Sequence, residues 1–135
     1  MKKVEYPPFD TGWIIVYGEL GSKSNSRKVV RFGNRTAVIK SDTARQYCKD
    51  FLKQVGANRK PYEGPVKLTA ICYYKDMRRD LDIALLQDLL QEGTPKNPGA
   101  CFIKNDRQIR HIEAIRKVDK DEPRVEFKLS KTALD

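Results

Sequence analysis

The sequence predicts a single α+β domain in which a mixed β-sheet of about four to six strands packs against two main helices. Its 135 residues are enough to bury one hydrophobic core and too few for two. Short runs rich in β-branched and aromatic residues predict strands, and two longer segments with apolar residues at helical spacing predict helices. No internal repeat divides the chain, so residues 1–135 are treated as one domain.

Six segments have the composition of β-strands. Trp13 to Tyr17 is a short, continuously apolar run, which predicts a buried strand. Val66 to Tyr74 alternates in the way expected of a central strand with one core-facing side. Gly33 and Asn34 predict the tip of a hairpin. The remaining predicted strands are residues 27–32 and 35–40, on either side of that tip, and residues 109–118 and 124–130.

Two segments have the pattern of helices with one apolar face. Ser41 is a favoured N-cap for a helix that runs to about Val55. The segment from Ile83 to about Gln91 predicts a second, packed helix. Residues 22–26 predict a flexible turn, and Gly93 to Gly99 predicts a loop. The apolar stripe of the first helix consists of Ala44, Tyr47, Cys48, Phe51, Leu52 and Val55.

The charge balance favours a polyanionic partner. Lysine and arginine outnumber aspartate and glutamate by 27 to 18, which gives a net charge of +9. The stretch from Lys23 to Arg45 holds seven basic residues and one acid, Asp42. It is either an ordinary solvated surface or an arm that contacts phosphates, and the lack of compensating acids favours the arm. The DNA-contacting residues predicted in this stretch are Arg27, Lys28, Arg31 and Arg35.

Other features narrow the classes of function. No apolar run is long enough to span a bilayer and the N-terminus lacks a signal-peptide core, so we expect a cytoplasmic protein without a membrane partner. Cys48, Cys72 and Cys101 lack C-x-x-C spacing, and we interpret them as reduced, mostly buried thiols rather than zinc ligands. His111 is the only histidine, which argues against metal sites built on several histidines.

The densest group of chemistry-bearing residues lies between the central strand and the second helix. Arg78 and Arg79 directly precede Asp80 and Asp82, and Asp106 follows further along the chain. Three carboxylates that meet need a cation between them, and oxygen ligands suit Mg²⁺ held jointly with a substrate phosphate. Local roles as helix N-caps or turn residues account for the same aspartates without any metal. Both interpretations stay open on these residues alone.

A rival metal motif is present near the C-terminus. Glu126 and Lys128 have the E-x-K spacing by which many restriction-type nucleases hold metal. Strand alternation already explains it, because Val125, Phe127 and Leu129 would face the core and the charged residues would face outward. We therefore expect no metal role for this motif.

Two segments taken together resemble a known family. Arg78-Arg79-Asp80-Leu81-Asp82 is followed by an apolar helix, a glycine-containing loop, and then Phe102-Ile103-Lys104-Asn105-Asp106-Arg107-Gln108-Ile109. This order is similar to that of the RusA family of Holliday junction resolvases, which are small, often phage-encoded endonucleases with an R-D-x-D-N-x-x-K helix start and a D-D-x-Q-[IV] segment. The resemblance covers residues 66–118, and weaker matches occur at Ser24-Asn25 and Asn34-Arg35-Thr36.

The resemblance implies a RusA-like fold and a homodimeric, Mg²⁺-dependent endonuclease, with Mn²⁺ as an alternative metal and no small-molecule cofactor. Such an enzyme makes paired, symmetric nicks across a four-way DNA junction in the cytoplasm of a bacterial or phage-infected cell. Asp80, Asp82 and Asp106 become the catalytic, metal-binding carboxylates, and Asp76 is left open as a further member. The DNA contacts predicted beside this site are Arg79, by the resemblance, and Lys75, Arg78 and Lys104, by their neighbouring positions.

The chain departs from the family pattern at three positions. Ile83 stands where the family has asparagine, Leu86 where it has a helix lysine, and Asn105 where it has the first of two consecutive acids. The family lysine is thought to be needed for cleavage, and Lys75 and Lys104 are the nearest substitutes. The alternative function is a catalytically silent relative that binds branched DNA without cutting it. An RNA-binding module is a weaker alternative, because no exposed-aromatic pattern for base stacking is evident.

Overall fold

Strand β4 (Val66–Tyr74) is the centre of the fold, and the rest of the sheet is built on its two edges. It pairs antiparallel with β6 (Arg124–Lys131) and parallel with β5 (Ile109–Val118). Strand β1 (Ile14–Tyr17) pairs antiparallel with the far side of β6. The sheet therefore has the order β1-β6-β4-β5 and is mixed, as the sequence predicts.

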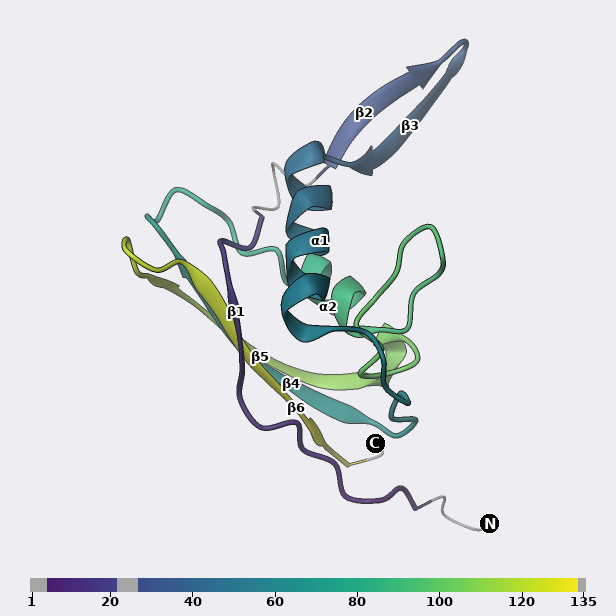
Figure 1. The fold of residues 1–135 in the computed structure, drawn as a ribbon, viewed down its shortest axis with the longest axis vertical. Coiled ribbons are helices and arrows are strands. Elements are labelled where there is room, and N and C mark those ends of the chain that lie inside the picture. The colour runs from purple at the N-terminus through teal and green to yellow at the C-terminus, as the bar shows by residue number, and fades with distance from the viewer. Residues whose placement is uncertain (1–4, 22–26, 134–135) are drawn as a thin grey trace.

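Two helices cover one face of this sheet and enclose the core (Figure 1). They are α1 (Asp42–Val55) and α2 (Ile83–Leu90). Every second side chain of β4 is buried against them, which is the period expected of a strand with one covered face. Phe51 of α1 stacks on Phe127 of β6 with 5.9 Å between ring centroids, and this contact joins helix to sheet.

Local sequence explains where both helices begin and where α1 ends. The Ser41 hydroxyl accepts a hydrogen bond from the Ala44 amide at 3.1 Å and caps the first turn of α1, as predicted. Gly56 follows the last residue of α1 with a φ of 73°, a left-handed conformation that glycine adopts without strain. The Asp82 carboxylate caps α2 by accepting from the Leu85 amide at 3.2 Å.

Strands β2 (Arg27–Phe32) and β3 (Arg35–Lys40) form the predicted hairpin, which turns at Gly33 and projects from the rest of the molecule (Figure 1). Its base is joined to α1 by an ion pair of 2.9 Å between Lys28 and Asp42. None of its residues belongs to the hydrophobic core of the described chain, so the hairpin is an arm. Its exposed large apolar side chains are Val29, Phe32 and Val38.

Over the residues that it describes, the structure confirms a single α+β domain with two α-helices and six strands, four in the mixed sheet and two in the hairpin. It is a computed structural model that describes residues 5–21 and 27–133. The turn predicted at residues 22–26, which includes Ser24 and Asn25, lies outside the described residues. Within the described ranges, no helix is long and apolar enough to cross a membrane.

The prediction of a buried strand at Trp13 to Tyr17 is wrong in its burial. Strand β1 is an edge strand, and of its side chains only Val16 is fully buried. Trp13, Ile15 and Tyr17 are exposed on the uncovered face of the sheet. A continuous apolar run does not reveal which of its two faces will be covered, because the helices that cover the sheet are remote in sequence.

The three cysteines are free thiols, as expected, but they are less buried than the sequence suggests. Cys72, on the covered side of β4, is fully buried, and burial raises the pKa of its thiol to about 12. Cys48 and Cys101 are half-buried. Nothing in this arrangement gives the thiols a chemical role.

The packing predicts very different costs for truncating two phenylalanines. Phe51→Ala removes a fully buried ring and should lower the free energy of unfolding by about 3–5 kcal/mol. Phe32→Ala removes a ring that is 65% exposed on the hairpin and should change it by less than about 0.5 kcal/mol. Urea denaturation of both variants measures the difference. Equal losses would show that the hairpin packs on the body of the protein.

Candidate functional site

Helix α2 and the short 3₁₀ helix η1 (Asp106–Gln108) bring acidic side chains together from distant parts of the sequence. Asp82 caps the start of α2, and Asp88 lies further along the same helix. Burial raises the pKa of Asp88, and the negative charges of Asp106 and Asp82 raise it further. Asp82 and Asp106 therefore both act electrostatically on Asp88, and we call these three carboxylates the acidic cluster.

Asp82 is the most constrained member of this cluster. It is 4% exposed and is the one buried charged residue in the part of the chain that the structure describes. Its Oδ1 accepts the hydrogen bond that caps α2. Its Oδ2 accepts no hydrogen bond from the described residues, so it is free to contact a cation. Asp82 therefore caps α2, as the local sequence predicts, and its second carboxylate oxygen remains available to bind a cation.

Asp106 is held in place by glutamine side chains. Its amide donates to Oε1 of Gln91, the residue that follows α2, at 3.2 Å. The amide of Asn105 donates to Oε1 of Gln108 at 3.1 Å, which closes a capping box around η1. The Gln108 side-chain amide donates in turn to the carbonyls of Tyr62 and Gly64. The D-x-Q-I segment is thus a structural device that fixes Asp106 beside α2.

Asp80, the remaining predicted carboxylate, lies in the connection between β4 and α2. Its carbonyl accepts a hydrogen bond of 3.4 Å from the Tyr74 hydroxyl. Its carboxylate makes no hydrogen bond or ion pair with the described residues. Asp76, earlier in the same connection, accepts from the Arg78 amide at 2.9 Å, as a turn residue does. The acids that act most strongly on Asp88 are Asp106 and Asp82.

The cluster has the oxygen donors that Mg²⁺ prefers but does not form a closed cage. In the described ranges, no three side chains of His, Cys, Asp and Glu are placed to hold one metal ion by themselves. Mg²⁺ usually keeps several waters and takes one or two protein carboxylates together with substrate phosphates. Two or three carboxylates within electrostatic reach fit that mode of binding, in which the substrate completes the coordination.

Two basic side chains border the cluster, and both come from the hairpin. Arg27 approaches Asp88 with 3.9 Å between Nη2 and Oδ2. The positive charges of Lys40 and Arg27 oppose the rise in the pKa of Asp88. Leu86, where the family has its lysine, is fully buried in the core, so no side chain at that position reaches the cluster. The hairpin supplies the cations that α2 lacks.

The two lysines predicted to substitute for the family lysine contact residues outside the acidic cluster. The ammonium group of Lys104 forms an ion pair with Glu63 at 2.7 Å, and this hydrogen bond raises the pKa of Lys104. The Lys75 amide donates to the Glu19 carboxylate at 3.0 Å at the end of β4. Neither lysine is among the groups that act on Asp88 most strongly.

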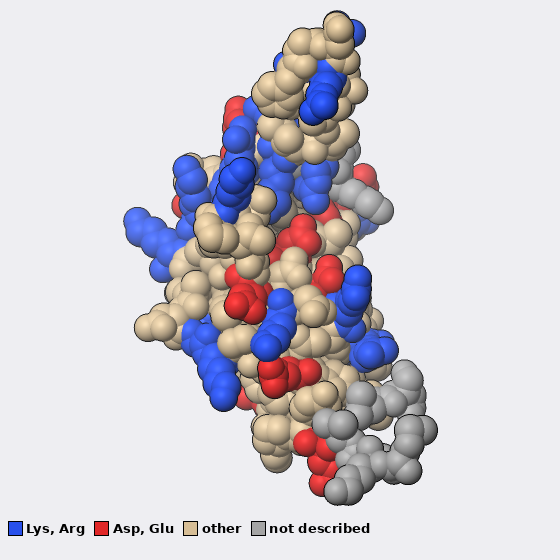
Figure 2. Space-filling model, turned by 90° about the vertical axis from the view of Figure 1, so that its right-hand side faces the viewer, with Lys and Arg blue, Asp and Glu red and all other residues tan. Residues whose placement is uncertain are grey.

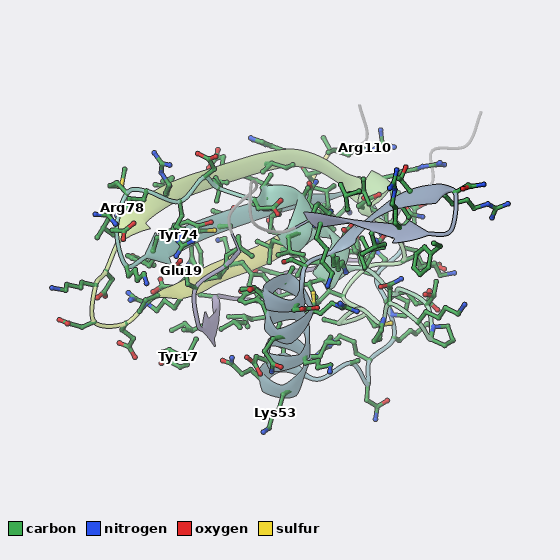
Figure 3. The ribbon with its side chains drawn as sticks, turned by 90° about the horizontal axis from the view of Figure 1, so that it is seen from above. Tyr17, Glu19, Lys53, Tyr74, Arg78 and Arg110 are labelled. Carbon is green, nitrogen blue, oxygen red and sulfur yellow. The ribbon has the colours of Figure 1, made fainter. Side chains whose placement is uncertain are left out.

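Seven of the eight predicted DNA contacts fall into two separate regions, and Lys104, just before η1, lies outside both. Arg27, Lys28, Arg31 and Arg35 belong to the hairpin. Lys75, Arg78 and Arg79 belong to the connection after β4, where Arg79 pairs with Glu19 at 3.1 Å. Figure 3 shows Arg78 on the opposite side of the molecule from the hairpin. Figure 2 shows basic side chains gathered below the hairpin, with acidic side chains below them.

The E-x-K motif near the C-terminus has the strand role expected of it. Glu126 pairs with Arg124 at 2.7 Å on the uncovered face of the sheet. The Lys128 ammonium group lies 5.5 Å from the centroid of the Trp13 ring on the same face. These contacts give Glu126 and Lys128 local partners on the sheet surface.

Comparison with known proteins adds no relative. The chain matches no protein-family model, and no curated protein is significantly similar to it. The resemblance to the RusA family therefore stays a prediction that depends on the residues quoted above.

Sequence reasoning missed three residues of the site. Asp88 has a recognisable signal, because it is the one charged residue within the apolar helix α2. Gln91 and Lys40 have no signal of that kind, since their importance comes from contacts with segments remote in sequence. Lys40 was part of the basic stretch and was not distinguished from its neighbours.

The raised pKa of Asp88 predicts a pH-dependent effect of Asp88→Asn in metal-free buffer. The folded protein favours the protonated carboxyl, so ionised Asp88 opposes folding at pH values above its pKa. The variant should be more stable than the wild type at pH 7, and the gain should vanish as the pH falls below the ordinary value of 3.8. Chemical denaturation in EDTA at several pH values measures this. A variant that is less stable at pH 7 contradicts the assignment.

Proposed function

We propose that the protein is a metal-dependent endonuclease that cuts branched DNA. The observation that carries the proposal is the acidic cluster, in which Asp82, Asp88 and Asp106 come together from two segments of a strongly basic protein. Carboxylates that lie near basic side chains suit a divalent cation bound together with a phosphodiester. The order of residues from Arg78 to Ile109 adds the resemblance to the RusA family.

In this proposal, Asp82 and Asp106 hold Mg²⁺ or Mn²⁺ jointly with the scissile phosphate, and Asp88 joins them. Asp80 stays in the proposed set because it precedes Asp82 in the motif. A divalent cation held by these carboxylates would supply activation of a water molecule and stabilisation of the charge that develops on the phosphate oxygens. Arg27 and Lys40 neutralise the phosphate at the cluster and take the place of the family's helix lysine.

The remaining basic side chains position the DNA. The hairpin residues Lys28, Arg31 and Arg35 contact phosphates on one side of the cluster, and Arg78 and Arg79 contact them on the other. Lys75 and Lys104 are weaker contacts, since Lys104 is already paired with Glu63. These contacts carry affinity rather than sequence preference, because phosphates look alike at every base pair.

The four-way junction is the substrate that the resemblance favours, and a homodimer is the matching assembly. A two-fold dimer presents two identical cutting sites to a substrate with nearly two-fold symmetry. Paired nicks placed symmetrically across the junction then follow from the symmetry alone. The cytoplasm is the proposed place of action, because it is where such a protein meets its DNA.

A second candidate function is binding of branched DNA without cleavage. The buried position of Leu86 favours it, because the family's lysine cannot be replaced from α2 itself. Both functions share the substrate and differ in whether phosphodiester bonds are broken.

Cleavage of a synthetic four-way junction, set against a linear duplex of the same sequence, tests the proposal. Mg²⁺ should produce symmetric nicks in the junction alone. Asp82→Asn should reduce cleavage by roughly 100-fold or more while the protein still folds, because asparagine caps a helix about as well as aspartate. Asp80→Asn, Asp88→Asn and Asp106→Asn test the other carboxylates.

Asp121→Asn is the matched control, since Asp121 is an exposed acid in the turn between β5 and β6. It should cleave like the wild type. Tight junction binding without nicks under Mg²⁺ or Mn²⁺ would establish the second candidate function. A protein that prefers the duplex, or binds neither DNA, would refute both.

A further inference from the structure

A cleft of about 680 Å³ opens between the base of the hairpin, the start of α1, the side of α2 and the loop that follows α2. The face that carries this loop is turned toward the viewer in Figure 2. Among the residues of the described chain that line the cleft are Arg27, Lys40, Arg45, Asp88, Gln91 and Lys96. Asp88 belongs to the acidic cluster and Gln91 holds Asp106, so the cleft leads to the proposed site of cutting.

The loop that forms one wall of this cleft is a fixed turn. The Thr94 amide donates to the Asn97 carbonyl at 3.0 Å, and the Asn97 amide donates to the Thr94 hydroxyl at 3.1 Å. At the far end of the loop, the Ala100 amide donates to the Leu89 carbonyl of α2 at 2.7 Å. A Cβ added to Gly99 would lie 1.8 Å from the Gln91 carbonyl oxygen, so only glycine allows this closure. The turn therefore presents Lys96 from a defined position.

The charges that line the cleft do not cancel. Four basic side chains line it, against the single carboxylate of Asp88. Arg45 pairs with Asp42, and Arg27 approaches Asp88. Lys40 donates to Sγ of Cys48 at 3.9 Å, and its charge acts on Asp88 without a close ion pair. Lys96 forms no ion pair with any residue that the structure describes. The resulting excess of positive charge favours an anionic ligand in this space.

The dimensions of the cleft limit what the anion can be. The cleft holds about 680 Å³, which is far less than a duplex segment occupies, since the major groove of B-DNA is by itself about 12 Å wide. The cleft can therefore enclose only a small part of a nucleic acid. The volume lies within the range of about 300–1,000 Å³ in which proteins enclose small organic ligands, which suits a few nucleotides of one strand.

We propose that this cleft binds the sugar-phosphate backbone of one unpaired DNA strand and guides it to the acidic cluster. Lys96 contacts the strand from the loop, Arg45 from α1, and Lys40 from the hairpin. The protein then selects DNA in which a strand leaves the duplex, as strands do at a branch point. The inference rests on the proposed function only in taking DNA as the ligand and the acidic cluster as the place where the strand is cut.

Binding of a fluorescein-labelled oligothymidylate of eight nucleotides, measured by anisotropy in EDTA, tests this proposal without any cleavage. Lys96→Ala should weaken binding roughly fivefold at 0.1 M salt and reduce the slope of log K against log salt by about 0.7, the value for one lost phosphate contact with a single strand. Lys120→Ala is the matched control, because Lys120 is an exposed lysine in the turn between β5 and β6. It should change neither quantity.

A second variant tests the shape of the cleft rather than its charge. Gly99→Ala removes no charge but forces the loop away from Gln91, so it should also weaken binding of the oligonucleotide. Its circular dichroism spectrum should match that of the wild type. Binding of a linear duplex should be affected much less by either Lys96→Ala or Gly99→Ala, because a duplex contacts the hairpin outside the cleft.

Three results would overturn the proposal. Equal losses in Lys96→Ala and Lys120→Ala would show that the charge acts only through the general field of the protein. Unchanged binding in Gly99→Ala would remove the cleft from the explanation. Inorganic phosphate or thymidine monophosphate that competes as well as the oligonucleotide would show a small-anion site instead. These binding assays omit metal and so do not depend on cleavage. A protein that binds the oligonucleotide but does not cut the junction in the separate Mg²⁺ assay would refute the nuclease and leave the cleft assignment intact.

Discussion

The unfavourable position of the Asp88 carboxylate is the constraint on which the rest of the site depends, because burial and then the negative charges of Asp106 and Asp82 raise its pKa. Like charges gathered in one place oppose folding unless other interactions hold the elements that carry them. The apolar face of α2 does so, since burying a leucine side chain fully contributes roughly 1.5–3 kcal/mol. The fully buried leucines of α2 are Leu85, Leu86, Leu89 and Leu90. One of these buried leucines, Leu86, occupies the position at which the family has its helix lysine.

Asp106, in η1, is placed by neutral hydrogen bonds rather than by ion pairs. Gln91 accepts from the Asp106 amide, and Gln108 binds four backbone groups around η1. Because these contacts use the main chain of Asp106, its carboxylate stays free for a cation. The segment that follows α2 returns along it through the Ala100 and Phe102 amides, so the loop with Lys96 and the η1 helix are held to the same scaffold.

The cations near the cluster come from an element that adds nothing to the core. The hairpin is joined to the body by exposed ion pairs of Arg27 and Lys28, and such pairs contribute at most about 1 kcal/mol each. An arm held this weakly can adjust to a bound nucleic acid at low cost. In the proposed function, the carboxylates on α2 and η1 are held by the packed body of the protein, whereas the basic residues on β2 and β3 can adjust to the DNA.

Local sequence signals are enough to predict the elements of this fold. Ser41 begins α1, Gly33 turns the hairpin, and the alternation from Val66 to Tyr74 makes the central strand, because these signals act over a few residues. The sequence also indicated Asp82 and Asp106 as candidates. Only the tertiary structure decided that Asp88 and Lys40 join them, that Lys104 turns to Glu63, and that β1 lies at an edge. Those outcomes depend on distances between segments far apart in the chain, and no local pattern encodes them.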